Sequence, residues 1–300
     1  MTSSLRIVYM GTPEFAVAGL RALVENGCNV VAVVTMPDKP AGRGHKLQQS
    51  PVKQYALSVG LPVLQPERLK DETFLSELRV YKADLQIVTA FRMLPDVVWS
   101  MPRLGTFNLH ASLLPQYRGA APINWAIIHG DKETGCTTFL LRHDIDTGDI
   151  LLQERTAIGE TEDAGSLHDR LMEMSIGLTL RTTSLIEDCD RQGIPVPTTP
   201  QDTAVTLLPA PKLFKDNCRI DFSQSAEDIV NFVRGLSPYP AAWCNLTIHG
   251  QLYENVKVFR VRKGEGAICV HCADGTVSIE ELQLPGKKRM DAKSLLNGIH

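Results

Sequence analysis

Asn108 and His110 are the residues whose types and spacing first indicate chemistry. They lie two positions apart in the segment Thr106–His110, which reads as a strand, so both side chains project from one face. Acyl transfer to an amine needs a donor for the oxyanion that forms on the carbonyl and a group that exchanges protons with the amine. An amide and an imidazole can fill these roles, because histidine exchanges protons near neutral pH. The pair therefore predicts acyl transfer, with a strand that merely ends in polar residues as the alternative.

An acidic partner for the imidazole is expected in the turn IDTGD, residues 145–149, where a glycine permits a tight bend. Asp146 is the candidate, and Asp144 and Asp149 are its competitors. All three also fit the ordinary role of turn-forming aspartates, so their spacing alone leaves the choice open.

The elements that must position these groups alternate between apolar strands and amphipathic helices, which predicts a doubly wound, mostly parallel α/β sheet. We expect strands at Leu5–Met10, Asn29–Thr35, Pro62–Leu64, Ala83–Ala90, Thr106–His110, Gly135–His143 and Asp149–Ile158. We expect helices at Glu14–Glu25, Val52–Val59, Asp71–Tyr81 and Ala164–Ile186. Ligands of such sheets bind beyond the carboxyl ends of the strands, which is where Asn108 and His110 lie.

A proline-rich segment separates this part of the chain from the rest. Residues 188–211 contain five prolines and little periodicity, so we interpret them as an interdomain linker. Residues 1–187 then form a Rossmann-like catalytic domain. Residues 212–300 contain one predicted helix, Ala226–Leu236, followed by short alternating segments that are typical of a small, OB-like β-barrel.

Composition bounds the remaining possibilities. The 300 residues are 43% apolar and 22% charged, with no apolar run near the roughly 18 residues that span a bilayer and no secretory signal pattern, so we expect a cytoplasmic protein. Seven scattered cysteines suit a reducing compartment. Cys269 and Cys272 flank His271 but lack a second ligand pair, so we expect no metal. The net charge of -3 gives no global sign of a nucleic-acid partner.

The N-x-H pair, followed by SLLPQYRG and IDTGD, closely resembles the formyltransferase family whose members use 10-formyltetrahydrofolate. In that family the matching Asn, His and Asp are catalytic, so the resemblance assigns catalysis to Asn108, His110 and Asp146. It also implies 10-formyltetrahydrofolate as co-substrate, without a metal, in a site lined by Ser112, Leu113, Leu114 and Pro115. One departure stands after the fourth strand, where an aromatic-glycine pair is usual and this chain has Phe91 and Arg92. We expect these two residues to contact the folate.

Longer segments indicate the acceptor. The opening MGTPEFAV, the loop PDKPAGRGHKL with the later SPVK, and APKLFKDNCRIDF resemble the branch of the family that formylates the amino group of methionyl-tRNA. The resemblance implies that the long loop at residues 37–51 reaches into the acceptor end of the initiator tRNA. Basic side chains can meet phosphates there. We expect tRNA contacts from Arg43, Lys46 and Lys212, in a monomer without a membrane partner.

Other classes remain as alternatives. A glycinamide ribonucleotide formyltransferase would lack the C-terminal domain, whereas an amino sugar nucleotide formyltransferase would carry a similar one. A nicotinamide dehydrogenase is disfavoured because the first strand-to-helix turn offers only Gly11 of the glycine-rich fingerprint. A non-catalytic tRNA-binding protein would show salt-dependent affinity without chemistry.

Overall fold

The computed structural model describes residues 5–41, 46–202 and 204–298. Its contacts divide the chain into two compact units, each assembled from segments that are separated in the sequence. Unit 1 comprises Met1–Arg118, Gly135–Arg155 and Leu171–Leu207. Unit 2 comprises Gly119–Thr134, Thr156–Arg170 and Leu208–His300. The domain boundaries drawn at residues 188 and 211 stay a prediction.

The sheet of unit 1 contains, in the described residues, β1 (Ile7–Gly11), β2 (Val30–Val34), β5 (Val63–Leu64), β6 (Leu85–Thr89), β7 (Thr106–His110), β9 (Glu133–Leu140) and β10 (Ile150–Ala157). The strand order is β10-β9-β7-β6-β1-β2-β5. Pairing is parallel from β7 through β6, β1 and β2 to β5, and antiparallel between β7 and β9. The predicted doubly wound, mostly parallel sheet is confirmed.

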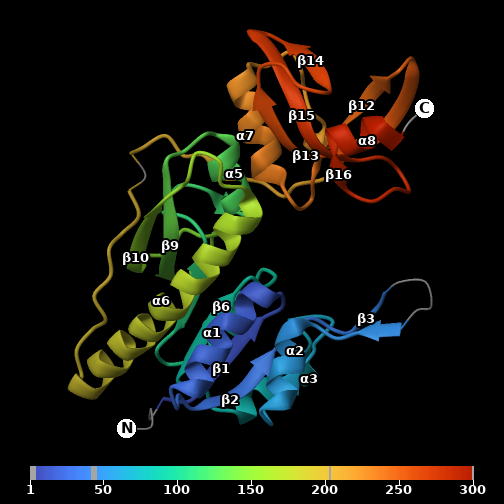
Figure 1. The fold of residues 1–300 in the computed structure, drawn as a ribbon. Helices are drawn as coiled ribbons and strands as arrows, with labels where there is room; N and C mark the ends of the chain where they lie inside the picture. Colours follow the sequence, from blue (N-terminus) through green and yellow to red (C-terminus); the bar gives the residue numbers. More distant parts are fainter. Residues whose placement is uncertain (1–4, 42–45, 203, 299–300) are drawn as a thin grey trace. The chain divides into compact units, whose positions relative to one another are not determined.

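Helices cover both faces of this sheet (Figure 1). One face packs against α1 (Glu14–Glu25), α2 (Pro51–Ser58) and α6 (Ala164–Gln192), and the other against α3 (Glu72–Val80) and α4 (Asp96–Trp99). Strand β1 contributes to the apolar cores on both faces, because successive side chains of a strand point to opposite faces. Ile7 and Tyr9 pack in the core on the side of α1, α2 and α6. Val8 and Met10 pack in the core on the side of α3 and α4. Helix α6 continues beyond the predicted end at Ile186, so that prediction was too short.

Packing explains the glycine at the first strand-to-helix turn. A Cβ atom on Gly11 would lie 2.6 Å from the Cβ of Ala16 and 3.0 Å from the carbonyl oxygen of Thr89. Real Cβ atoms do not approach other atoms so closely, so only glycine allows α1 to begin directly against the sheet. The residue is therefore accounted for without a bound nucleotide.

The described residues of the segment 37–51 contain two short strands that the sequence did not predict. Strands β3 (Lys39–Ala41) and β4 (Lys46–Gln48) pair antiparallel as a hairpin, with Lys39 opposite Gln48 (Figure 1). The sequence predicted a long loop without these strands, because proline and glycine mask the short strands that backbone pairing stabilises. Residues 42–45 lie outside the described part of the chain.

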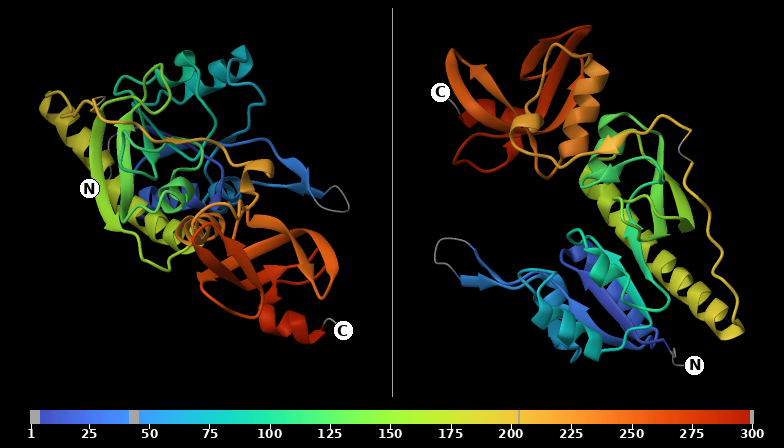
Figure 2. Two further views of the ribbon diagram at one scale, coloured as in Figure 1. Left: turned by 90° about the horizontal axis from the view of Figure 1, so that it is seen from above. Right: turned by 180° about the vertical axis from the view of Figure 1, so that it is seen from behind.

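Unit 2 is built around an antiparallel sheet. The described strands are β12 (Ala242–Ile248), β13 (Gln251–Lys263), β14 (Cys269–Cys272), β15 (Gly275–Gln283) and β16 (Met290–Asp291). Their order is β12-β13-β15-β14, with β16 paired to β15. Helix α7 (Ala226–Leu236) lies against this sheet (Figure 2). Its apolar residues Ala226, Ile229, Val233 and Leu236, three or four positions apart and therefore on one helix face, join the core of the unit. The predicted small β-domain after a helix is confirmed, and α8 (Ala292–Gly298) follows it.

Further short elements complete the unit: α5 (Pro122–Ile128), β8 (Arg118–Gly119), β11 (Pro209–Ala210) and a 3-10 turn at Asp216–Cys218. Helix α5, which the sequence did not predict, packs against α7, where Asn124 Nδ2 donates to the carbonyl of Gly235 at 2.8 Å. The buried guanidinium of Arg234 donates to the carbonyls of Gly159 at 3.1 Å and Glu162 at 2.9 Å. These bonds join distant segments of the chain into one unit.

Candidate active site

Strand β7 carries Asn108 and His110 between two neighbouring strands. Asn108 lies opposite Val88 of β6 and Phe139 of β9, and His110 lies opposite Thr137 of β9. The Oδ1 atom of Asn108 is buried and has no hydrogen-bond partner among the described residues. A buried polar atom without a partner is rare in a folded protein, so the amide of Asn108 is suited to receive a ligand.

One ring nitrogen of His110 makes a hydrogen bond and the other faces a carboxylate. Its Nε2 atom lies 2.8 Å from the carbonyl oxygen of Tyr117. Because a carbonyl only accepts, Nε2 carries the proton of this bond, which leaves the lone pair of the neutral ring on Nδ1. That Nδ1 atom lies 3.9 Å from Oδ2 of Asp146, and the two side chains are only 7% and 12% exposed. The structure thus brings His110 and Asp146 together at the end of β7.

The turn that carries Asp146 has an unusual backbone. Asp146 has a φ of +54°, a left-handed conformation that side chains other than Gly, Asn and Asp rarely adopt. The competing aspartates have other surroundings: Asp144 is exposed and lies 3.5 Å from Nδ1 of His143, and Asp149 is bound by Arg142 at 2.6 Å. Of the three aspartates in this turn, Asp146 is the one beside His110 in the structure.

The segment Ser112–Pro115 is fixed by two polar side chains from the antiparallel strands. The hydroxyl of Thr137 donates to the carbonyl of Ser112 at 2.7 Å and accepts from the Leu114 N–H at 3.2 Å and from Gln153 Nε2 at 2.9 Å. Gln153 also donates to the carbonyl of Leu114 at 3.1 Å. Ser112 and Leu114 are buried, whereas Leu113 and Pro115 are half-buried. The segment therefore has a defined backbone, with two side chains partly open to a ligand.

Phe91 and Arg92 follow the carboxyl end of β6, the strand next to β7. Phe91 packs against the core of α3 and α4. The guanidinium of Arg92 donates from Nη1 to the carbonyl of Glu67 at 2.7 Å and from Nη2 to the carbonyl of Pro66. Its Nε atom is buried without a partner among the described residues. The structure thus ties Arg92 to the segment after β5, and its contact with folate stays a prediction.

Among the residues expected to contact tRNA, the structure places Lys212 but not Arg43. Lys46 begins β4, and Arg43 lies outside the described residues. Lys212, in unit 2, is exposed, and its ammonium lies 5.4 Å from the centre of the Phe214 ring. No distance therefore relates these three side chains to one another or to His110.

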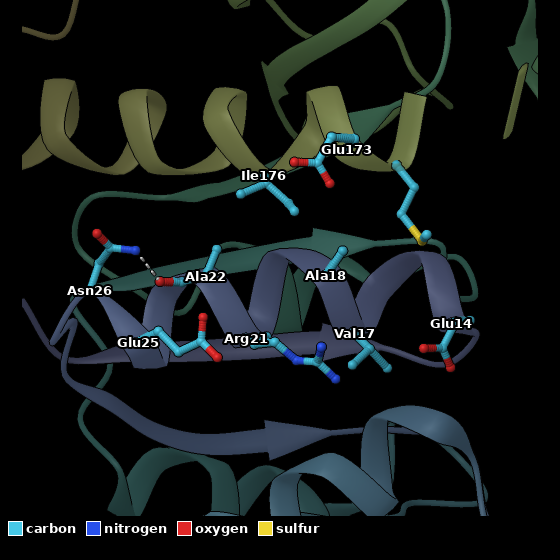
Figure 3. A pocket seen from close by; sticks show the side chains of 10 residues that line it. Glu14, Val17, Ala18, Arg21, Ala22, Glu25, Asn26, Glu173 and Ile176 are labelled. Atoms are coloured by element: carbon cyan, nitrogen blue, oxygen red, sulfur yellow. Dashed lines mark hydrogen bonds between the residues drawn. The ribbon is translucent and has the colours of Figure 1, made fainter. Parts of the chain in front are cut away.

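A cavity of about 250 Å³ lies apart from these groups, between α1 and α6 (Figure 3). Arg21 and Glu25 of α1 line it together with Glu173 and Ile176 of α6. Arg21 also stacks on Tyr55, with its guanidinium carbon 5.3 Å from the ring centre. The lining contains neither the acyl-transfer groups of β7 nor the segment Ser112–Pro115.

The described residues offer neither a metal centre nor a membrane-spanning helix. In the described part of the chain, no group of His, Cys, Asp and Glu side chains is arranged to hold a metal ion. Cys269 bonds to the backbone of Gly266, and Cys272 lies 3.5 Å from Oδ1 of Asp274. None of the described helices combines the length and apolar character needed to cross a membrane.

Comparison with known proteins identifies the family. Residues 5–182 match the model described as formyl transferase, and residues 212–300 match the model of the formyl transferase C-terminal domain. The chain belongs to the formyltransferase family. The resemblance inferred from the N-x-H, SLLPQYRG and IDTGD motifs is confirmed.

Full-length relatives and solved structures agree with this assignment. The chain is 57% identical to a methionyl-tRNA formyltransferase of Parabacteroides distasonis, over 98% of this chain and 95% of the relative. It is 55% identical to a methionyl-tRNA formyltransferase of Bacteroides fragilis, over 99% and 95% of the two chains. The sugar 3N-formyltransferase WlaRD, solved in the presence of dTDP and 5-N-formyl-THF, has the same fold with a TM-score of 0.64, 17% identity and coverage of 95% and 99%.

Sequence reasoning missed several residues that shape this formyltransferase site. Thr137 and Gln153 lie in strands that contain several other polar residues, ETGCTTFL and ILLQERTA, so no contrast in residue type singled them out. The carbonyl of Tyr117 could not be predicted as a partner of His110, because the sequence does not reveal the direction in which a backbone carbonyl points. No signal indicated Gln201 either: it lies in the proline-rich segment interpreted as a linker, yet it is buried and bonds to the turn of Asp146.

Proposed function

We propose that this formyltransferase transfers the formyl group of 10-formyltetrahydrofolate to the amino group of methionyl-tRNA, giving N-formylmethionyl-tRNA and tetrahydrofolate. The observation that carries the proposal is the 3.9 Å approach of His110 to Asp146, at the end of the strand that also bears Asn108, whose buried Oδ1 atom has no partner among the described residues. The acceptor is supported by full-length relatives named methionyl-tRNA formyltransferase. The donor is supported by the formylated folate present with the sugar formyltransferase.

The proposed reaction begins when the amine attacks the formyl carbon, which places negative charge on the formyl oxygen. Asn108 donates its amide N–H to this oxygen, and such donors act strongly because they are already oriented before the charge develops. The buried surroundings of β7 favour this role, since electrostatic interactions are stronger where water is excluded.

Proton transfer is the proposed task of His110. Because Nε2 donates to the carbonyl of Tyr117, the lone pair of Nδ1 takes the proton that the attacking amine loses. The carboxylate of Asp146 stabilises the resulting imidazolium, directly or through one water at this separation. The proton then passes to N10 of the folate as the bond between the formyl carbon and N10 breaks.

The proposed folate site lies along Ser112, Leu113, Leu114 and Pro115, whose backbone is held by Thr137 and Gln153. Phe91 and Arg92 belong to this proposal as residues that follow the neighbouring strand β6. The terminal nitrogens of Arg92 already donate to backbone carbonyls, so we assign it a role in shaping the loop around the folate.

For the acceptor, we propose that Arg43, Lys46 and Lys212 contact tRNA phosphates and that residues 212–300 act as the tRNA-binding domain. Such contacts make binding salt-dependent, because each neutralised phosphate releases counterions. We further propose that the protein acts as a monomer in the cytoplasm. Sedimentation at micromolar concentration tests the oligomeric state, with a dimer as the contradicting result.

One assay tests the proposed function. The protein is incubated with 10-formyltetrahydrofolate and methionyl-tRNA, and the aminoacyl ester is hydrolysed to measure N-formylmethionine. Parallel reactions offer an amino sugar nucleotide and glycinamide ribonucleotide as acceptors. Formylation of methionyl-tRNA at the highest kcat/KM supports the proposal. Preference for either rival acceptor, or tRNA binding without formylation, overturns it.

A further inference from the structure

The segment Thr199–Asp202 lies inside unit 1 rather than running free between domains. Thr199 and Ile150 exchange both backbone hydrogen bonds, each 2.8 Å long. Gln201 is 9% exposed, whereas Thr199, Pro200 and Asp202 on either side of it are exposed. A single buried glutamine in an otherwise exposed segment indicates that its amide has a specific structural task.

All the hydrogen-bonding capacity of the Gln201 amide is used within unit 1. Its Nε2 atom donates to the carbonyl of Asp146 and to the carbonyl of Gly148, both at 2.8 Å. Its Oε1 atom accepts two bonds from the guanidinium of Arg118, at 2.6 Å from Nη2 and 3.1 Å from Nε. The two donors and the two lone pairs of the amide are thus satisfied, which fixes the direction in which the amide points.

These bonds hold the turn in a conformation that it would not otherwise favour. Asp146 has a φ of +54°, and an L-residue in this region relaxes toward negative φ when nothing opposes it. The two N–H groups of the Gln201 amide bind the carbonyls of Asp146 and Gly148, on either side of Thr147, and these bonds oppose the relaxation. Relaxation of the turn would rotate the carboxylate of Asp146 away from Nδ1 of His110.

We propose that Gln201 is a positioning residue for catalysis: it braces the left-handed turn at residues 146–148 so that the Asp146 carboxylate faces His110, and Arg118 fixes the direction of its amide. The inference rests on the proposed role of Asp146 in formyl transfer. It also assigns the proline-rich segment a part in the active site, in addition to joining the two parts of the chain.

Two substitutions separate the elements of this proposal. Gln201→Glu keeps the size and the acceptor for Arg118 but replaces the donor pair with an oxygen that repels the carbonyls of Asp146 and Gly148. Gln201→Met keeps the size, removes every hydrogen bond and introduces no charge, so it remains informative if the Glu variant fails to fold. The matched control is Gln283→Glu, because Gln283 also donates to one backbone carbonyl, that of Lys287 at 2.8 Å.

Steady-state kinetics supply the first readout. We expect kcat to fall by about 10- to 100-fold in Gln201→Glu and Gln201→Met, as for small misplacements of catalytic groups, while both KM values change by less than about twofold. Gln283→Glu should match the wild type. Unchanged kcat in both Gln201 variants, or a rise in KM that accounts for the whole loss, overturns the proposal.

A double-mutant cycle tests whether Gln201 acts through Asp146. In an Asp146→Asn background, Gln201→Met should lower kcat by less than about twofold further, because the group that it positions is already gone. Multiplicative losses would show that Gln201 acts elsewhere and would overturn the proposal.

Hydrogen exchange keeps this inference separate from the proposed function. Amides in peptides covering residues 139–151 should exchange at least about tenfold faster in Gln201→Met than in the wild type, and Gln283→Glu should leave them unchanged. Equal exchange in the Gln201 variants overturns the bracing role. If the wild type formylates nothing but the exchange difference is present, the proposed function fails while the brace is retained.

Discussion

The Nζ atom of Lys53 lies 2.6 Å from Oδ2 of Asp38 and 2.6 Å from Oε1 of Gln65. Gln65 in turn donates to Oδ1 of Asp38 at 2.8 Å and to the carbonyl of Met36 at 2.8 Å. The PDK and SPVK motifs, which are separated in the sequence, thus meet at the base of the β3–β4 hairpin. Their co-occurrence has a structural cause, because each motif supplies one partner of this network.

This network predicts a pH-dependent contribution to stability. Hydrogen bonds from Lys53 and then Gln65 hold the pKa of Asp38 below its ordinary value. A carboxyl with a lower pKa in the folded state stabilises the fold above its unfolded pKa of about 3.9, and this stabilisation is lost as the pH falls through the folded pKa. Lys53→Met should therefore lower the free energy of unfolding at pH 7, and this loss should shrink as the pH falls below about 3.9.

Urea unfolding at pH 7 and at pH values below about 3.9 measures this difference. Arg79→Met is the control, because Arg79 and Glu72 are 3.9 Å apart with exposed side chains, and such pairs contribute little. A loss of stability in Lys53→Met that does not shrink at the lower pH values would contradict the assignment to Asp38.

The proposed catalytic residues predict large kinetic effects. Asn108→Ala, His110→Ala and Asp146→Asn should each lower kcat by about 100- to 1,000-fold, the scale found for lost oxyanion donors. Asp144→Asn should retain wild-type turnover, because Asp144 is exposed beside His143. Single-turnover formylation of methionyl-tRNA measures the chemical step. Near-normal rates in Asp146→Asn, with a loss in Asp144→Asn or Asp149→Asn, would move the acidic role to that residue.

The surroundings of Gly148 and Gly177 predict opposite effects of a glycine-to-alanine substitution on stability. A Cβ atom on Gly148 would lie 1.5 Å from the carbonyl oxygen of Leu140, so Gly148→Ala should destabilise the protein by about 1–3 kcal/mol through forced displacement of the backbone. Gly177 lies within α6 with nothing within 4 Å of such an atom, so Gly177→Ala should stabilise it by about 0.5–1 kcal/mol. Equal effects in thermal unfolding would contradict this account.

Thr137 predicts a link between stability and folate affinity. Thr137→Val keeps the shape of the side chain but leaves the carbonyl of Ser112 and the N–H of Leu114 without this partner, which should cost about 1–3 kcal/mol. The loosened segment should also raise the KM for 10-formyltetrahydrofolate. Thr73→Val, at an exposed position of α3, is the control for both measurements. If Thr137→Val is as stable as the wild type and its KM for 10-formyltetrahydrofolate is unchanged, the role of Thr137 in holding the folate site is contradicted.

Strong periodicity made the architecture of unit 1 predictable. The predicted helix Glu14–Glu25 and the predicted strand Thr106–His110 coincide with α1 and β7, because each buries a regular pattern of apolar side chains. Helix α5 escaped prediction because it is short, follows a glycine- and proline-rich segment, and is stabilised by distant partners such as Gly235. The β3–β4 hairpin was not predicted for a similar reason, because backbone pairing between the two strands outweighs the low strand propensity of their residues.

The candidate site was predictable to a different extent. Strand alternation placed Asn108 and His110 on one face, but the choice of Asp146 among three aspartates depended on the family resemblance. In the structure, the left-handed backbone at Asp146 and the Arg142 partner of Asp149 distinguish them. Gln201 was unpredictable, because all its partners, two backbone carbonyls and the guanidinium of Arg118, are more than 50 positions away in the sequence.

Helix α5 is synthesised well before α7, the helix against which it packs. The ribosome releases Asn124 and Ile128 long before Gly235 and the apolar core against which Ile128 packs have been made. A nascent chain that has reached only the proline-rich segment therefore holds an α5 without its partner, and the apolar side of that helix stays uncovered. Unit 2 can close only when its last strands have emerged, and apolar surface that is exposed in the meantime is prone to aggregation.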